Sequence, residues 1–192
     1  DEKLKECAPW FFAGETPIHR FSVPTDTGDG IDMLRELGVE PNPERMYISM
    51  FGPKHHPFSN VLADLALEPA AVQVNLNGKR WVDESIGLHE MTHSIAQQPK
   101  EISWAIQSLD NLTEIANRFI NNPALAEQNM ANPAMAKRVW QFQTWEEELE
   151  EESKLDTPVK KADTLEELAE LCGIPGQALV DTVKRYNEFC AK

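Results

Sequence analysis

The chain has 192 residues, of which 41% are hydrophobic and 26% charged, as in an ordinary globular domain. Its net charge is −14, with 18 Lys and Arg against 32 Asp and Glu, and no basic stripe is visible. These features exclude a nucleic-acid interface built on clustered cations, and no apolar run approaches the roughly 20 residues that a membrane span needs.

The cysteines and the first residue bear on the context of the chain. Cys7, Cys172 and Cys190 are an odd number without a CxxC pair, so we expect small buried side chains rather than a disulfide framework. The sequence does not fix the compartment, although this cysteine usage slightly favours the cytoplasm. Because the chain starts at Asp1 without an initiator Met, we expect it to be a piece of a longer protein.

Short helices are predicted near the N-terminus. Residues 1–7 favour one or two helical turns, and a second helix opens at residues 27–30, which read TGDG. Asp29 is placed to cap this helix, because its carboxylate can accept hydrogen bonds from the free N–H groups of the first turn. Gly38 stands where a helix-terminating glycine is expected. The apolar face of the helix consists of Ile31, Leu34 and Leu37.

A β-hairpin is the main signal in the middle of the chain. Two strands flank an Asn-Gly pair at residues 77–78, and this pair suits a type I′ turn, in which both central residues need φ > 0. A helix is expected to begin near residues 83–84. The other predicted elements here are strands over residues 45–51 and 102–108 and a short helix over residues 60–67.

The rest of the chain is predicted to be helical from Leu112 onward. Apolar positions are too sparse in residues 134–154 for a core helix, so this segment is predicted to be an exposed helical arm. Thr164 and Glu167 have the spacing of a capping box, and the last helix covers residues 177–190. The solvated face of the arm would consist of Glu146, Glu147, Glu148, Glu150, Glu151 and Glu152. This mix of elements predicts an α+β fold, with helices packed on a small mixed or antiparallel sheet.

Residues 89–93 read HEMTH and match the H-E-x-x-H pattern of zinc hydrolases. On a helix, His89 and His93 would project from one face as zinc ligands, with Glu90 as general base. A catalytic zinc also needs a third ligand, for which Asp110 and Glu114 are the downstream candidates, although neither sits in a recognisable second motif. We therefore keep a zinc-dependent hydrolase as an alternative and assign no metal ligand.

Three stretches together resemble the FAD-dependent oxidoreductases of the fumarate reductase/succinate dehydrogenase flavoprotein family. Residues 27–33 (TGDGIDM) are similar to its T-G-D-G-h-x-M motif, and residues 74–84 (VNLNGKRWVDE) to V-N-x-x-G-K-R-F-V-N-E. Residues 164–190 are similar to the helix pair T-L-E-E-L-A…G-I…A-L-x-x-T-V-x-R-Y-N. The order and spacing of these stretches extend the resemblance over nearly the whole chain.

The resemblance implies that residues 1–192 are a single substrate-capping domain of a larger flavoprotein. Thr27, Gly28, Asp29 and Gly30 would then approach the nucleotide part of FAD. The chain has no G-x-G-x-x-G after a strand, so the pyrophosphate cradle must lie outside it. We therefore expect the FAD-binding domain of the same parent chain as partner, a small-molecule substrate, and weak or no binding of FAD by this chain alone.

In this family a hydride moves between flavin N5 and a substrate carbon, and a side chain of the capping domain transfers the accompanying proton. Where fumarate reductases carry an Arg proton donor, this chain has Leu88, and the substrate elements of the family are not intact. We therefore predict no appreciable reduction of fumarate. His56 and His89 are the candidate proton donors, because histidine titrates near neutral pH. Arg80 would either hold a substrate carboxylate or pair with Glu84.

A third class remains open beside the flavoprotein cap and the zinc hydrolase. The acidic segment within residues 134–154 would also suit a non-catalytic interaction module. The three classes differ in what they require: a flavin in the parent protein, a stoichiometric zinc ion, or neither.

Overall fold

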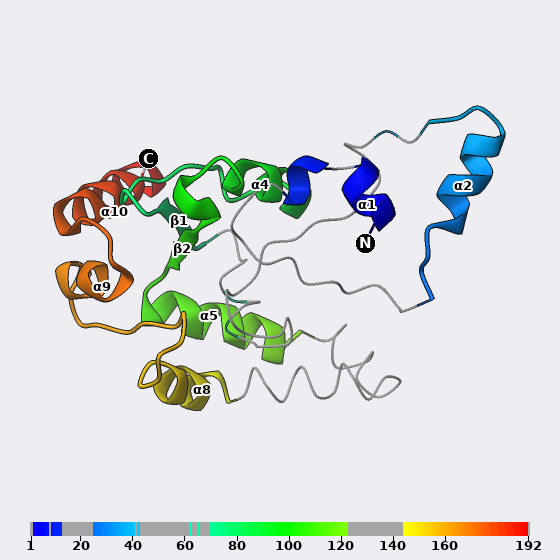
Figure 1. Cartoon of the computed structure of the whole chain (residues 1–192). Coiled ribbons are helices and arrows are strands. Elements are labelled where there is room, and N and C mark those ends of the chain that lie inside the picture. Colours follow the sequence, from blue (N-terminus) through cyan, green and yellow to red (C-terminus); the bar gives the residue numbers. More distant parts are fainter. Residues whose placement is uncertain are drawn as a thin grey trace.

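The computed structural model describes residues 2–7, 9–12, 25–40, 42, 62, 65, 70–122 and 144–191. In the first part of the chain these form α1 (Glu2–Cys7), the 3-10 helix η1 (Pro9–Phe12), α2 (Asp29–Glu36), β1 (Val72–Asn75), α4 (Leu88–Ile95) and the 3-10 helix η2 (Pro99–Glu101). They continue with β2 (Ser103–Ile106), α5 (Leu109–Ile120), α8 (Trp145–Glu152), α9 (Leu165–Cys172) and α10 (Gly176–Cys190). Figure 1 shows α9 and α10 beside the two strands and α2 at the other end of the molecule. The predicted α+β class is confirmed.

The sheet consists of β1 and β2, paired antiparallel from Val72 opposite Ile106 to Asn75 opposite Ser103. Both strands lie where the sequence predicts strands. The return strand of the expected hairpin is reduced to a single bridge between Val74 and Arg80. The main partner of β1 is therefore β2, which follows α4 and η2, rather than the segment after the turn.

The turn after β1 closes through a hydrogen bond from the Gly78 N–H to the Asn75 carbonyl, at 2.9 Å. Gly78 has φ 71°, whereas among the described non-glycine residues only Lys100 and Glu101 have positive φ. Asn77 is therefore not left-handed, and the predicted type I′ turn is wrong. Instead the Asn75 side chain fixes the turn, because its Oδ1 accepts hydrogen bonds from the N–H groups of Asn77 and Lys79.

Helix α2 ends as predicted but begins differently. Gly38 has φ 76°, and its N–H and that of Val39 bond to the Arg35 and Leu34 carbonyls, both at 2.9 Å, as in a Schellman motif. The N-cap residue is Gly28 rather than Asp29, and no side chain caps the helix. The Asp29 carboxylate instead accepts a hydrogen bond from the Thr27 hydroxyl, at 2.6 Å.

The helix predicted near residues 83–84 begins four or five residues later, at Leu88. The Asp83 carboxylate holds a local turn, because its Oδ1 accepts hydrogen bonds from both the backbone N–H and the hydroxyl of Ser85. Asp83 therefore acts as a turn-forming residue. Glu84 turns into the protein instead.

Two hydrophobic cores organise the described residues. The first joins α5 to α8 and consists of Leu65, Ile115, Ala116, Trp145 and Leu149. The second lies between the sheet and the last two helices and consists of Val72, Val74, Ile106, Ala169, Cys172, Ile174 and Leu179. Cys172 is buried as expected, whereas Cys190 is exposed and the Cys7 side chain lies outside the described residues.

The expected exposed arm is wrong for its described part. Trp145 and Leu149 are only 6% and 8% exposed, because these two side chains, four residues apart on α8, pack into the first core. The glutamates of α8 occupy its remaining surface, where Glu146, Glu147 and others are exposed. Two apolar positions one turn apart are enough to dock a short helix. Residues 134–143 lie outside the described part of the chain.

The C-terminal helices follow the predicted signals closely. Thr164 and Glu167 form both hydrogen bonds of a capping box at the start of α9. Gly173, with φ 66°, ends this helix and lets Ile174 enter the second core. On α10, Leu179 is fully buried, whereas Phe189 is exposed.

Some predictions lie wholly or mostly outside the described residues. These are the strand over residues 45–51, the loop that contains His56, and the helix over residues 60–67 apart from two helical positions, Leu62 and Leu65. They remain predictions.

Candidate functional site

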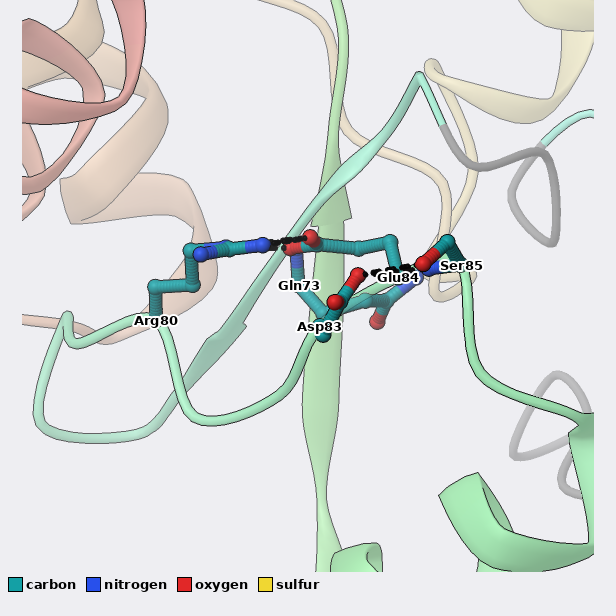
Figure 2. A network of polar contacts seen from close by, with 5 residues as sticks. All are labelled: Gln73, Arg80, Asp83, Glu84 and Ser85. Carbon is teal, nitrogen blue, oxygen red and sulfur yellow. Dashed lines mark hydrogen bonds and ion pairs between the residues drawn. The ribbon is translucent and has the colours of Figure 1, made fainter. Parts of the chain in front are cut away.

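A polar cluster surrounds Arg80. Its Nε–H lies 3.0 Å from both oxygens of Glu84, and its Nη2 bonds to Glu84 Oε2. Glu84 is only 5% exposed, and its Oε1 also accepts a hydrogen bond from the Gln73 backbone N–H of β1, at 2.9 Å. Figure 2 shows Arg80 reaching across to Glu84, with Asp83 and Ser85 forming a separate pair. Of the two roles open for Arg80, pairing with Glu84 is confirmed.

The electrostatics of the cluster follow from these contacts. Hydrogen bonds to Glu84 are the main reason why the pKa of Arg80 lies above its ordinary value, so the guanidinium stays charged. The pKa of Asp83 is lowered, mainly because the Ser85 backbone N–H stabilises its charged form. Arg80 therefore lies against the buried Glu84 side chain and close to the exposed carboxylate of Asp83.

The last helix packs directly on this cluster. The guanidinium carbon of Arg80 lies 5.3 Å from the centre of the Tyr186 ring, within the range of a cation–π contact. The Thr182 hydroxyl donates a hydrogen bond to the Gly78 carbonyl at 2.7 Å. A Cβ atom at Gly78 would lie 2.9 Å from the Ala178 Cβ, so the turn touches α10 without room for a side chain.

A second polar network fastens the turn to the sheet. The Trp81 indole N–H donates to the Ser103 hydroxyl of β2 at 2.9 Å, and this hydroxyl donates to Gln73 Oε1 at 2.8 Å. The Asn75 side-chain amide donates to Gln98 Oε1 at 2.9 Å. Because Gln73 and Asn75 are almost fully buried, these bonds satisfy groups that burial alone would destabilise.

The predicted nucleotide-binding residues lie elsewhere, at the start of α2. Gly28 has φ 84°, and a Cβ atom there would lie 2.8 Å from the Lys3 Cδ, whereas a Cβ atom at Gly30 would have nothing within 4 Å, so the open backbone of this turn is at Gly30. The Asp29 carboxylate accepts a hydrogen bond from Thr27, and the Asp32 carboxylate forms an ion pair with Lys3. A carboxylate beside an open stretch of backbone can accept a hydrogen bond from a hydroxyl group of a ligand.

The H-E-x-x-H motif does lie on a helix, α4, as the spacing predicts. The His89 side chain is outside the described residues, and His93 is partly buried. Within the described part of the chain, no group of three or more His, Cys, Asp or Glu side chains is placed to hold a metal ion. The zinc alternative therefore gains no support.

The structure joins two of the three motifs that carry the family resemblance. The turn within residues 74–84 and the helix pair within residues 164–190 form one body, through contacts of α10 with Gly78 and Arg80. The turn at residues 27–30 lies apart from them, at the α2 end of the molecule (Figure 1). Outside α2, this turn contacts Lys3 of α1, whose ammonium group donates a hydrogen bond to the Gly28 carbonyl.

Sequence reasoning missed three residues of the cluster: Gln73, Thr182 and Tyr186. Tyr186 is 106 positions from Arg80 in the sequence, so no local spacing connects the two. One signal was available, because Arg80 and Tyr186 both stand inside family-like motifs. Because the two motifs follow each other in the same order as in the family, direct contact between them could have been proposed.

No family model matches the chain, and no solved structure matches it. It is 28% identical over 178 residues to a 4-oxocyclohexanecarboxylate 2-dehydrogenase of Sinomonas cyclohexanicum, which covers 88% of this chain and 26% of that protein. It is 31% identical over 170 residues to an NADH:acrylate oxidoreductase of Vibrio harveyi, which covers 85% of this chain and 14% of that protein. The chain thus resembles a part of two oxidoreductases and spans well under a third of either.

No helix among the described residues is long and apolar enough to cross a membrane.

Proposed function

We propose that this chain is the substrate-capping domain of an FAD-dependent oxidoreductase that acts on a carbon–carbon bond of a small carboxylic acid. One observation carries the proposal. Two oxidoreductases are similar to the chain over 85% and 88% of its length, so the likeness covers the whole domain rather than one motif. The choice of FAD rests on the motifs at residues 27–33, 74–84 and 164–190.

FAD, when bound, would supply hydride transfer to or from the substrate carbon. Asp29 and the backbone at Gly30 would hold a hydroxyl-bearing part of the cofactor, and Gly28 would shape the turn beside Lys3. The turn at residues 75–80, braced by α10, would form a wall of the substrate site and exclude water from it. His56 and His89 remain the proposed proton donors.

The substrate class follows from the names of the relatives. One acts on 4-oxocyclohexanecarboxylate and the other on acrylate, and both compounds are small carboxylic acids with one carboxyl group. Fumarate has two carboxyl groups and requires a second anchoring cation. Because both relatives act on compounds with one carboxyl group, we propose a monocarboxylate as substrate.

The remainder of the site would come from polypeptide outside this chain, in particular an FAD-binding domain. The exposed apolar side chains of α2 support this part of the proposal. Met33 and Leu37 are 66% and 79% exposed, next to Leu34 and Val39, which are about half exposed. Contiguous apolar surface of this kind marks an interface.

The test uses the protein translated from the whole reading frame that contains these residues. After anaerobic reduction, it should be reoxidised rapidly by acrylate and far more slowly by fumarate. His89→Gln should slow the acrylate reaction, and the exposed Glu188→Ala should leave it unchanged as a matched surface control. Rapid reoxidation by fumarate, or none by any unsaturated carboxylate, would contradict the proposal.

A further inference from the structure

The unoccupied edge of Arg80 is the feature that carries a further inference. A guanidinium has five N–H donors in a fixed planar arrangement. The Glu84 carboxylate accepts hydrogen bonds from Nε and Nη2, which form one edge of the planar group. The end of the group, formed by Nη1 and the second N–H of Nη2, has no hydrogen-bond partner among the described residues. The side chain is 37% exposed, so solvent reaches it.

Three contacts fix the direction of this edge. Glu84 holds the guanidinium from one side, the Tyr186 ring covers one of its faces at 5.3 Å, and the bridge to Val74 fixes the backbone of Arg80. A carboxylate accepts two parallel hydrogen bonds from such a planar edge. Because Arg80 is already held in place, binding costs less side-chain entropy than it would for a free arginine.

We propose that the free edge of Arg80 binds the carboxylate of the substrate, and that Tyr186 is a positioning residue that holds Arg80 for this task. The proposal rests on the proposed function for its substrate class. It adds that α10, more than 100 residues from the turn, takes part in substrate affinity. Tyr186 acts through Arg80, and the contact that holds Arg80 is made by the Tyr186 ring rather than by its hydroxyl.

Glu84 and Asp83 affect how strongly Arg80 can bind a carboxylate. Both carboxylates lie close to Arg80 and compete electrostatically with an incoming carboxylate. Replacing Glu84 with Gln keeps a hydrogen-bond acceptor and removes one negative charge. Glu84→Gln should therefore tighten carboxylate binding even though it loosens the fold. A purely structural role for Arg80 predicts the reverse.

The test is a titration of the full chain, labelled with ¹⁵N-arginine, with sodium acrylate as the probe. The Arg80 Nε–H signal, identified by its loss in Arg80→Lys, should shift and saturate in the millimolar range. Acrylamide, a neutral analogue of acrylate, should cause no shift. A wild-type signal that does not respond to acrylate would overturn the site.

The role of Tyr186 is tested by three variants. Tyr186→Leu should weaken acrylate binding roughly fivefold, the effect of losing a partly exposed cation–π contact. Tyr186→Phe keeps the ring and should bind like wild type. Phe189→Leu is the matched control, because it removes a similar contact to Arg185 on the same helix, at 5.5 Å. Equal affinities in Tyr186→Leu and wild type would overturn the positioning role.

Two further comparisons keep the result interpretable. If Tyr186→Leu does not fold, Glu84→Gln decides instead: tighter acrylate binding supports the site, and weaker or unchanged binding overturns it. The titration also separates this inference from the proposed function. A whole protein without flavin would contradict the proposed function and leave the acrylate shift of Arg80 as measured.

Discussion

Arg80 illustrates what spacing along the sequence predicts and what it does not. The pairing with Glu84 was one of two readings of a positive and a negative side chain four residues apart, and the structure confirms it outside any helix. Burial of Glu84 was not predictable, because it depends on the Gln73 N–H of β1 as an additional donor. The contact with Tyr186 depends on tertiary packing alone.

Among the described non-glycine residues, Lys100 and Glu101 have strained backbone conformations, with φ values of 55° and 57°. Lys100→Gly should raise the free energy of unfolding by about 1 kcal/mol, because glycine adopts this conformation without the clash of a Cβ atom. Urea denaturation measures the change. The same substitution at Lys184, inside α10, should instead lower it by about 1 kcal/mol. Equal losses at both positions would show that Lys100 is not strained.

The two described cysteines should differ in reactivity. Burial raises the pKa of Cys172 to about 11, so at pH 8 almost none of it is thiolate, the form that reacts. Cys190 is exposed on α10. Iodoacetamide at pH 8 should therefore modify Cys190 and spare Cys172 until the protein unfolds, as peptide mass spectrometry can show. Modification of Cys172 at the same rate would mean that the second core is open.

At the level of elements, signals confined to one turn of the chain predicted structure well. The capping box at Thr164 and the terminating glycines Gly38 and Gly173 all hold, because each depends on neighbouring residues alone. Predictions that ignored competing partners did not hold. Asp29 bonds to Thr27 instead of capping α2, and the Asn75 side chain holds the turn that an Asn-Gly pair was expected to form.

The prediction of an exposed arm at α8 was wrong for a different reason. Its composition is dominated by glutamate, and the average hydrophobicity of the segment hides Trp145 and Leu149. These two positions face the first core, whereas the charged positions need only face water. The direction of each side chain decides which residues are buried here. The average hydrophobicity of the segment carries no information about this direction.

Docking of the turn on α10 can be tested with two glycines that share a conformation. Gly78 and Gly38 have φ 71° and 76°, so Ala costs similar backbone strain at either position. Only at Gly78 would the added Cβ meet another atom, at 2.9 Å from Ala178. Gly78→Ala should therefore lower the free energy of unfolding by about 2 kcal/mol more than Gly38→Ala. Similar losses in urea denaturation would show that the turn does not press on α10.

At the scale of the molecule, the sequence predicts the α+β class, whereas the packing of the turn within residues 74–84 on α10 was not predicted. The sheet order was not predictable, because β1 pairs with a strand beyond α4 rather than with the nearest candidate. The candidate site is similarly divided. Arg80 and Glu84 follow from the sequence, whereas Gln73, Thr182 and Tyr186 required the three-dimensional arrangement.

The position of residues 27–30 bears on how the proposed cofactor site and substrate site are arranged. They lie at the α2 end, away from the Arg80 cluster (Figure 1). Under the proposal, residues 27–30 would contact one part of FAD, and the turn at residues 75–80 would form a wall of the substrate site. We propose that the rest of the site between these two regions comes from polypeptide outside this chain. The chain spans 26% and 14% of the length of its two relatives.

The decisive measurement is the visible absorption spectrum of the protein translated from the whole reading frame. We predict a bound flavin, close to one per chain, that is bleached on reduction and restored by acrylate. A colourless protein that takes up no FAD when the cofactor is supplied would contradict the assignment of this chain to a flavin-dependent oxidoreductase.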